Sequence, residues 1–579
     1  MSSKWSELVS DKRRRQEESI PKEWLISQPP INVLDVTSIP EESDVLSARE
    51  IEITNCQVEL LLVKLASAEW TSLEVTTAFY KRAIIAQQLV NCLTEIFVEQ
   101  AFARAKELDD HLKRTGQVLG PLHGLPISLK DQLAIKGLET TMGMSQHWSW
   151  LVTTFTSAFQ PGYASWIGRY ASKNAVLVDI LYECGAVPFV RTNVPQTLMW
   201  GETYNHIFGR TTNPYNRKLT CGGSSGGEAA LIALKGSPLG VGSDIGGSIR
   251  QPAAFCGLYG LRPSYGRIPY AGAGNSMEGQ DSVLSVFGPM SNSIAGVKLF
   301  MKAVIERQPW LKDPLAVRKK WDEAEYNLVD HGAGKQLCFA IMWDDKHIAP
   351  HPPITRGLKL VKHALSAAGH QVIDWEPFKH EELSDAVRSI WNAGSNEDFL
   401  VTTSATGEPV ITTMSVEPGE EDPQFRPTPQ TDGITAYQLW QVQKRKRDLR
   451  KEYLDHWEAT ASKTGTGRPV DAIICPATAF VACPHGMTRH TCYLATWNAL
   501  DYAACIFPVS KVDPVLDAKQ ARDTFFNDSD KAHYESYDPE TFSNAPISLS
   551  LVGRTLEEEA VIAMTEIVDA AVKAFKSSQ

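Results

Sequence analysis

Hydrophobic and polar positions along the chain follow the periods of both helices and strands. The sequence Thr71-Ser72-Leu73-Glu74 forms a capping box, and the apolar stripe of Val75, Phe79 and Ile84 follows it. Two later segments repeat a helix, a glycine and a short apolar strand, over 176–190 around Gly185 and over 358–375 around Gly369. Further apolar runs over 337–343 and 472–475 indicate buried strands. The pattern predicts an α/β fold.

A basic run over 444–451 (KRKRDLRK) has two interpretations. It could be a nuclear-import signal, or it could be one face of a helix. The apolar residues around it fall near helical spacing: Leu439, Val442, Leu449, Tyr453 and Trp457. This spacing favours a helix whose basic residues form a solvated face.

Composition and charge narrow the class of protein. The chain has 579 residues, of which 43% are hydrophobic and 22% charged, which excludes disorder, collagen and coiled coil. Its 57 basic and 68 acidic residues leave a net charge of −11, without the basic surplus of a nucleic-acid binder. No secretory signal fits the polar N-terminus, and the uncharged stretch 148–168 is too polar to span a membrane.

The ten cysteines indicate a reducing compartment. They form no C-x-x-C pair, as expected for reduced thiols inside a cell, so we expect a cytoplasmic protein. Cys475, Cys483, Cys492 and Cys505 lie in apolar surroundings and are spaced too widely for a zinc site, so we interpret them as thiols of the core or of a pocket wall.

The densest chemical signal is a pair of glycine-rich segments with serines. The first is Cys221-Gly222-Gly223-Ser224-Ser225-Gly226-Gly227-Glu228 and the second is Asp244-Ile245-Gly246-Gly247-Ser248-Ile249-Arg250. Such segments let backbone N–H groups converge on an anion or a developing oxyanion. A phosphate-binding loop would need a lysine after these glycines, and none follows at the required spacing. A nucleophile elbow would need a strand directly before it, but 213–218 has the composition of a loop. Incidental serines in glycine-rich turns would not explain both segments, which leaves a serine nucleophile.

A serine nucleophile needs a base, and neither glycine-rich segment contains a histidine. A neutral lysine can serve, because lysine loses its proton readily when desolvated. Lys130 is the candidate, since it ends a short apolar strand after a Gly/Pro turn in Gly120-Pro121-Leu122-His123-Gly124-Leu125-Pro126-Ile127-Ser128-Leu129-Lys130-Asp131. Taken alone, such a residue is more often a surface lysine than a catalytic base.

Together these motifs resemble the amidase signature family. The resemblance continues through Tyr259-Gly260-Leu261-Arg262-Pro263-Ser264, and over nearly the whole length it is strongest to fungal acetamidases. It implies a single large α/β/α domain with a mixed, twisted central sheet flanked by helices. We place this domain at 71–579, preceded by a helical extension over 1–70 packed on the core.

The resemblance also implies the roles of the site residues. Ser248 would be the nucleophile, Ser224 the bridging serine after a cis peptide bond, and Lys130 the base. The N–H groups of Ile245, Gly246, Gly247 and Ser248 would form the oxyanion hole. Ser225, Asp244 and Arg250 would hold the loop. No cofactor or metal is expected.

The implied activity is hydrolysis of a carboxylic amide through an acyl-enzyme, with a small aliphatic amide such as acetamide favoured. Three alternatives stay open, because pocket walls vary around one catalytic loop. These are an amidase for aryl, indole or specialised-metabolite amides, a glutamine-dependent amidotransferase subunit, and a scaffold without turnover. The expected partners are a small-molecule amide and water, without nucleic acid or membrane. A homodimer is one oligomeric alternative.

One segment departs from the family pattern. Thr141-Met142-Gly143 is separated from Tyr163-Ala164-Ser165-Trp166 by 144–162, and removing those 19 residues restores the family's T-M-G-Y-A-S-W. Gly143-Met144-Ser145 can be encoded with the intron-start string GTATGAGT, and Pro161-Gly162 with a terminal AG in the matching phase. We hypothesise that Met144 to Gly162 is a translated intron, the alternative being a genuine loop. Being apolar without a core to enter, it should form an irregular, poorly packed excursion.

Overall fold

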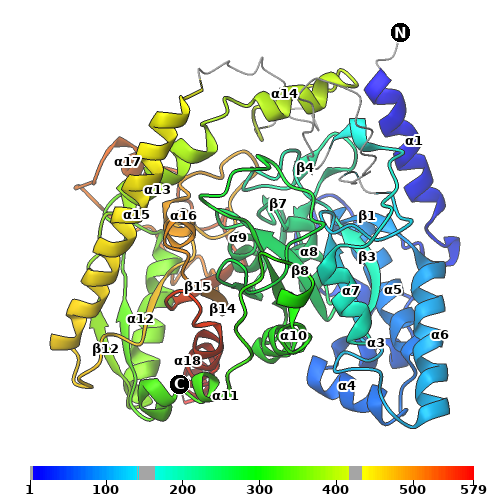
Figure 1. The fold of residues 1–579 in the computed structure, drawn as a ribbon, viewed down its shortest axis with the longest axis horizontal. Helices are drawn as coiled ribbons and strands as arrows, with labels where there is room; N and C mark the ends of the chain where they lie inside the picture. The colour runs from blue at the N-terminus through cyan, green and yellow to red at the C-terminus, as the bar shows by residue number, and fades with distance from the viewer. Residues whose placement is uncertain (1–3, 140, 142–162, 416–432, 579) are drawn as a thin grey trace.

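The computed structural model describes residues 4–139, 141, 163–415 and 433–578 (Figure 1). Within them the chain forms one eleven-stranded mixed sheet flanked by helices, so the predicted α/β architecture is confirmed. The first helices lie at one end of this sheet, and α12 and α15 lie at the other. The strands in spatial order are β1 (Leu93–Ile96), β3 (Val187–Thr192), β2 (Pro126–Lys130), β8 (Leu239–Asp244), β10 (Val286–Ser291), β9 (Tyr259–Arg262), β14 (Ala504–Lys511), β15 (Pro546–Val552), β13 (Ala472–Pro476), β11 (Cys338–Ile341) and β12 (Gln371–Asp374).

Strand direction explains where chemistry can gather. β2 runs parallel to both β3 and β8, whereas β10 is antiparallel to β8 and to β9. The carboxyl ends of parallel neighbours meet at one edge of a sheet, which is where open α/β sheets bind their ligands. Lys130 is the last residue of β2 and Asp244 the last of β8, so the fold delivers both to the same edge.

Helices follow the strands in sequence and cover the sheet. Their bounds are α1 (Lys4–Glu18), α2 (Ile39–Glu42), α3 (Ala48–Asn55), α4 (Val58–Ala66), α5 (Ser72–Val90), α6 (Val98–Thr115), α7 (Val176–Glu183), α8 (Gly226–Ala233), α9 (Arg250–Phe255), α10 (Ile294–Glu306), α11 (Glu323–Tyr326), α12 (Pro352–Ala367), α13 (His380–Trp391), α14 (Glu397–Ser404), α15 (Ala436–Glu458), α16 (Cys492–Leu500), α17 (Asp528–Glu535) and α18 (Glu558–Ser577). Two short hairpins pair β4 (Tyr204–Asn205) with β5 (Gly209–Arg210) and β6 (Thr212–Asn213) with β7 (Asn216–Thr220).

The elements predicted from periodicity are present. Thr71 caps α5 by accepting a hydrogen bond from the Glu74 N–H, and most residues of the helix are buried in the core. The two helix–glycine–strand units are α7 with β3 and α12 with β12, and the apolar runs are β11 and β13. Gly185 and Gly369 both have φ near +85°, the left-handed conformation that ends a helix with least strain in glycine.

The helix predicted around the basic run is α15, but one of its basic residues is not exposed to solvent. Leu449, Tyr453 and Trp457 are buried as expected. Lys446 is also buried, and its amine donates a hydrogen bond to the Ser282 carbonyl oxygen. The expectation of a fully solvated basic face is therefore wrong at this residue. The reason is that the loop containing Ser282 crosses this side of the helix.

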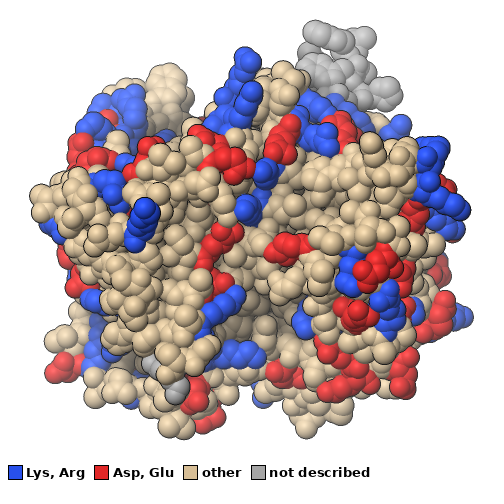
Figure 2. Space-filling view, turned by 90° about the horizontal axis from the view of Figure 1, so that it is seen from below, with Lys and Arg blue, Asp and Glu red and all other residues tan. Residues whose placement is uncertain are grey.

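Charged side chains of both signs are interspersed over the molecular face that Figure 2 shows. This distribution agrees with the balance of 57 basic and 68 acidic residues. Among the residues with described coordinates, no helix is both long and apolar enough to cross a membrane.

Ion pairs attach the first helix to later parts of the chain. Lys12 is buried on α1 and contacts the carboxylates of Glu95 and Glu139, while Arg15 contacts Glu139 at 2.6 Å. Burial raises the pKa of Glu139, but Arg15 and Lys12 outweigh it and lower that pKa to about 2. The N-terminal basic run is therefore a structural contact, at least at these two positions.

The segment Met144 to Gly162 lies outside the described residues, but its flanks are informative. The Gly137 N–H donates to the Ala171 carbonyl at 2.9 Å, and the Ala171 N–H donates to the Leu138 carbonyl at 3.0 Å. The chain before and after the segment is therefore joined by backbone hydrogen bonds, so the ends are held near each other without it. We expect a variant lacking 144–162 to fold with a similar melting temperature, and transcript sequencing to find these codons removed. Transcripts that run unbroken through them in most messages would contradict the intron hypothesis.

Candidate active site

Four of the predicted site residues meet at the carboxyl ends of β2 and β8. Lys130 comes from β2, Ser224 and Ser225 precede α8, and Asp244 ends β8. All four are buried, with side chains 0–1% exposed. The two glycine-rich segments are joined directly, because the Ser225 N–H donates to the Ser248 carbonyl at 3.2 Å.

The amine of Lys130 is hydrogen-bonded to two serine hydroxyls. Its Nζ lies 2.7 Å from the Ser224 Oγ and 2.8 Å from the Ser243 Oγ. Burial lowers the pKa of Lys130 to about 7, against the smaller opposing effects of Asp244 and Glu228. A considerable fraction of Lys130 is therefore neutral at physiological pH, which is the form that can accept a proton.

The hydrogen bonds around Lys130 set the direction of its contact with Ser224. The Gln132 Nε2 donates to the Tyr270 Oη at 2.8 Å, so the Gln132 carbonyl oxygen faces Ser243 and accepts from its hydroxyl at 2.6 Å. The Ser243 oxygen must then accept from Lys130. Protonated Lys130 donates to both serines, whereas neutral Lys130 has one lone pair and can accept from the Ser224 hydroxyl, the one not already donating to Gln132.

Ser224 follows a cis peptide bond to Gly223. The interpretation of 213–218 as a loop is wrong, because β7 covers Asn216–Thr220 and directly precedes this motif. The strand nevertheless belongs to a two-stranded hairpin with β6 and not to the central sheet. The serine that follows it contacts a lysine, so the arrangement differs from a nucleophile elbow with a histidine base.

The turn after β8 is tied to the side chain of Asp244. The Arg250 guanidinium donates to both Asp244 oxygens, at 2.9 and 3.0 Å, and the Asn498 Nδ2 donates to Asp244 at 3.0 Å. Burial raises the pKa of Asp244, but the Arg250 cation and the Asn498 amide outweigh it, so the net shift is downward and the carboxylate stays ionised. Ser225 adds a contact, because its Oγ lies 3.3 Å from both the N and the O of Ser243.

The backbone amides of this turn are not all available for an oxyanion. The Gly247 N–H donates to the Asp244 carboxylate at 2.8 Å, so this predicted donor is engaged in the structure. The N–H groups of Ile245, Gly246 and Ser248 have no acceptor among the described residues. Gly247 has φ of +127°, and a Cβ on it would lie 2.5 Å from the Leu494 side chain, so both its conformation and its surroundings require glycine.

Ser248 lies at the exposed side of the site. It is half-buried, and in the described part of the chain its hydroxyl makes no hydrogen bond to a protein group. The structure therefore joins Lys130 to Ser224 but does not form the link from Ser224 to Ser248. Catalytic hydrogen bonds are often long before substrate binds.

Sequence reasoning missed Gln132, Ser243 and Asn498. Gln132 and Ser243 adjoin predicted residues, so their closeness in sequence was an available signal. Asn498 lies 254 residues from Asp244, and no local pattern could have indicated it. Within the described ranges, no cluster of three or more His, Cys, Asp or Glu side chains could hold a metal ion.

The chain resembles known amide-hydrolysing proteins along almost its full length. The family model described as Amidase matches residues 74–562. The acetamidase of Aspergillus oryzae is 42% identical over 568 residues, covering 98% of both chains, and that of Emericella nidulans is 40% identical with the same coverage. A solved structure of fatty acid amide hydrolase superposes with a TM-score of 0.86 at 31% identity, covering 98% of this chain and 95% of that one. This chain therefore belongs to the amidase family and is an enzyme that hydrolyses amides.

Proposed function

We propose that this amidase hydrolyses small aliphatic primary amides, acetamide among them, with Ser248 as nucleophile and Lys130 as base. The observation that carries the proposal is the 2.7 Å contact between Lys130 and Ser224, made by a buried lysine whose pKa is lowered to about 7. The preference for a small substrate rests on the two acetamidases that are similar over 98% of the chain.

The proposed reaction begins with proton transfer through Ser224. Neutral Lys130 accepts the Ser224 proton while Ser224 takes the proton of Ser248, whose oxygen attacks the amide carbon. The carbonyl oxygen becomes an oxyanion, which the N–H groups of Ile245, Gly246 and Ser248 stabilise. Gly247 contributes by holding Asp244 and so shaping the turn.

The second half of the proposed reaction reverses the relay. The proton returns through Ser224 to the leaving nitrogen, the C–N bond breaks, and ammonia departs. Water then attacks the acyl-enzyme, its proton passing to the same relay, and the carboxylate leaves with Ser248 restored. The ion pair of Asp244 with Arg250 keeps the turn in one geometry throughout, so Asp244, Arg250 and Ser225 act as positioning residues.

A panel of primary amides assayed for ammonia release tests the proposal. We expect kcat/KM for acetamide and propionamide to exceed that for phenylacetamide, indole-acetamide and long-chain amides by about 10-fold or more, because each methylene beyond a pocket's size carries a penalty of that order. Higher activity on aryl or indole amides would favour the first alternative. Ammonia release from glutamine alone would favour an amidotransferase subunit, and no release from any amide would favour a scaffold.

The free thiols also support a location for this activity. All ten cysteines are unpaired and nine of them are buried. Unpaired thiols are typical of a reducing compartment, so we infer a cytoplasmic enzyme acting on a small-molecule amide and water.

A further inference from the structure

Trp391, the last residue of α13, lies against the proposed oxyanion turn. A Cβ placed on Gly246 would be 2.5 Å from the Trp391 Cη2 and 3.0 Å from its Cζ2. The six-membered ring therefore packs on the backbone of Gly246, on the side where a side chain would project. Gly246 is itself only half-buried, so the ring covers part of the turn that the substrate must reach.

Trp391 also lines a cavity of about 560 Å³. Its walls are the loop 277–282, the end of α13 with α14, and the beginning of α15. A volume of this size is in the range of sites for drug-sized ligands. Acetamide has four non-hydrogen atoms, so a small substrate alone would not need it.

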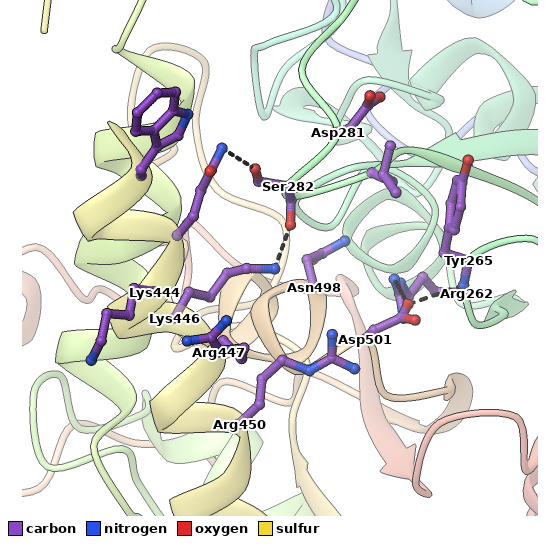
Figure 3. Close-up of a pocket in the computed structure, with 13 residues that line it drawn as sticks. Arg262, Tyr265, Asp281, Ser282, Lys444, Lys446, Arg447, Arg450, Asn498 and Asp501 are labelled. Carbon is purple, nitrogen blue, oxygen red and sulfur yellow. Dashed lines mark hydrogen bonds and ion pairs between the residues drawn. The ribbon is translucent and has the colours of Figure 1, made fainter. Parts of the chain in front are cut away.

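The loop wall of this cavity is fixed in place from two sides. On one side the Met277 N–H donates to the Asp398 carboxylate of α14 at 2.7 Å. On the other, Gln443 of α15 donates to the Ser282 hydroxyl at 2.7 Å and Lys446 donates to the Ser282 carbonyl. Figure 3 shows this second side from the neighbouring pocket, which Arg262, Lys446 and Asp501 line. The cavity is thus bounded by contacts that hold its shape and is not a gap between unconnected elements.

The cavity is lined by apolar side chains and by acidic ones. Met277, Ile390, Phe399 and Leu439 supply apolar surface. Among the described residues, four acidic ones line it and no Lys, Arg or His does, the acidic ones being Glu278, Asp281, Glu397 and Asp398. A bound chain with a terminal carboxylate would meet like charge, whereas a neutral or cationic end would not.

We propose that Trp391 is the residue that limits the acyl length of the substrate, by separating the catalytic turn from this cavity. Removing the ring would join the two spaces and admit amides with longer acyl chains whose far end is neutral or cationic. This inference rests on the proposed function, because it explains why a small amide is preferred beside a large cavity.

The test compares acetamide with three six-carbon amides: hexanamide, its analogue with a terminal ammonium, and its analogue with a terminal carboxylate. In Trp391→Ala, the ratio of kcat/KM for hexanamide to that for acetamide should rise by about 10- to 100-fold over the wild-type ratio. The ammonium analogue should be hydrolysed at least as well as hexanamide, and the carboxylate analogue about 10-fold less well. Trp391→Leu should give a smaller rise and serves if the alanine variant does not fold.

Trp440→Ala is the matched control, because Trp440 is 60% exposed on α15 and does not line this cavity. Its chain-length ratio should equal that of the wild type. Folded Trp391 variants that turn over acetamide with an unchanged ratio would overturn the inference while leaving the proposed function intact. A wild-type enzyme that already prefers hexanamide would instead contradict the proposed small-amide function.

Discussion

Ser248→Ala should lower kcat/KM for acetamide by about 10,000-fold or more, the usual loss when a nucleophile is removed from a serine hydrolase. The melting temperature should stay within a few degrees of the wild type, because the half-buried Ser248 hydroxyl makes no protein hydrogen bond in the described part of the chain. Ammonia release and thermal unfolding, measured on the same preparation, separate these two effects. Ser67→Ala, at an exposed position after α4, is the control and should change neither.

Covalent labelling assigns the nucleophile independently of turnover. A fluorophosphonate probe should modify Ser248 and no other serine, since Ser224 and Ser225 are buried and only Ser248 is partly exposed at this site. Peptide mapping after labelling identifies the modified residue. Labelling that persists in Ser248→Ala would contradict the assignment.

Local patterns were sufficient to predict many elements of the fold but not the order of its strands. The cap at Thr71 and the glycines at 185 and 369 act within a few residues, so the sequence alone indicates where α5, α7 and α12 begin or end. Strand order depends on contacts between distant segments: β9 lies between β10 and β14, and β14 is more than 200 residues away in sequence. No periodicity encodes such a neighbour. The fold class therefore came from pattern, whereas the mixed sheet came from family resemblance.

The residues of the candidate site also fall into those that local sequence indicates and those that depend on distant contacts. Glycine and serine runs are local, so they indicated Ser224, Ser248 and the turn that ends β8. The residues that contact this turn are distant in sequence. Asn498 donates to Asp244 from 254 residues away, and Trp391 packs on Gly246 from the end of α13. Lys130 could be identified as buried only once β2 was placed between β3 and β8. Resemblance gave the residue its role, and geometry accounts for its lowered pKa.

Lys130→Ala should lower kcat/KM for acetamide by about 1,000-fold or more, since general-base catalysis contributes up to about 10,000-fold. In the wild type, kcat/KM should rise with pH and be half-maximal near pH 7, because only the deprotonated form of Lys130 accepts a proton and its pKa is about 7. A stopped ammonia assay between pH 5 and 9 measures this profile. Lys136→Ala, at an exposed position six residues further on, should reproduce the wild-type profile.

A midpoint near pH 7 does not by itself identify the lysine, because burial raises the pKa of Glu228 to about 7 as well. Glu228 accepts hydrogen bonds from Ser128 and Thr192, and in the described part of the chain it makes none to Ser224 or Ser248. Its carboxylate favours the protonated form of Lys130, so Glu228→Gln should lower the pKa of Lys130 and move the rise in kcat/KM to lower pH. If Glu228 were the base, the same variant would lose activity at every pH. A folded Glu228→Gln enzyme that is inactive throughout, or whose rise moves to higher pH, would exclude the proposed role of Lys130.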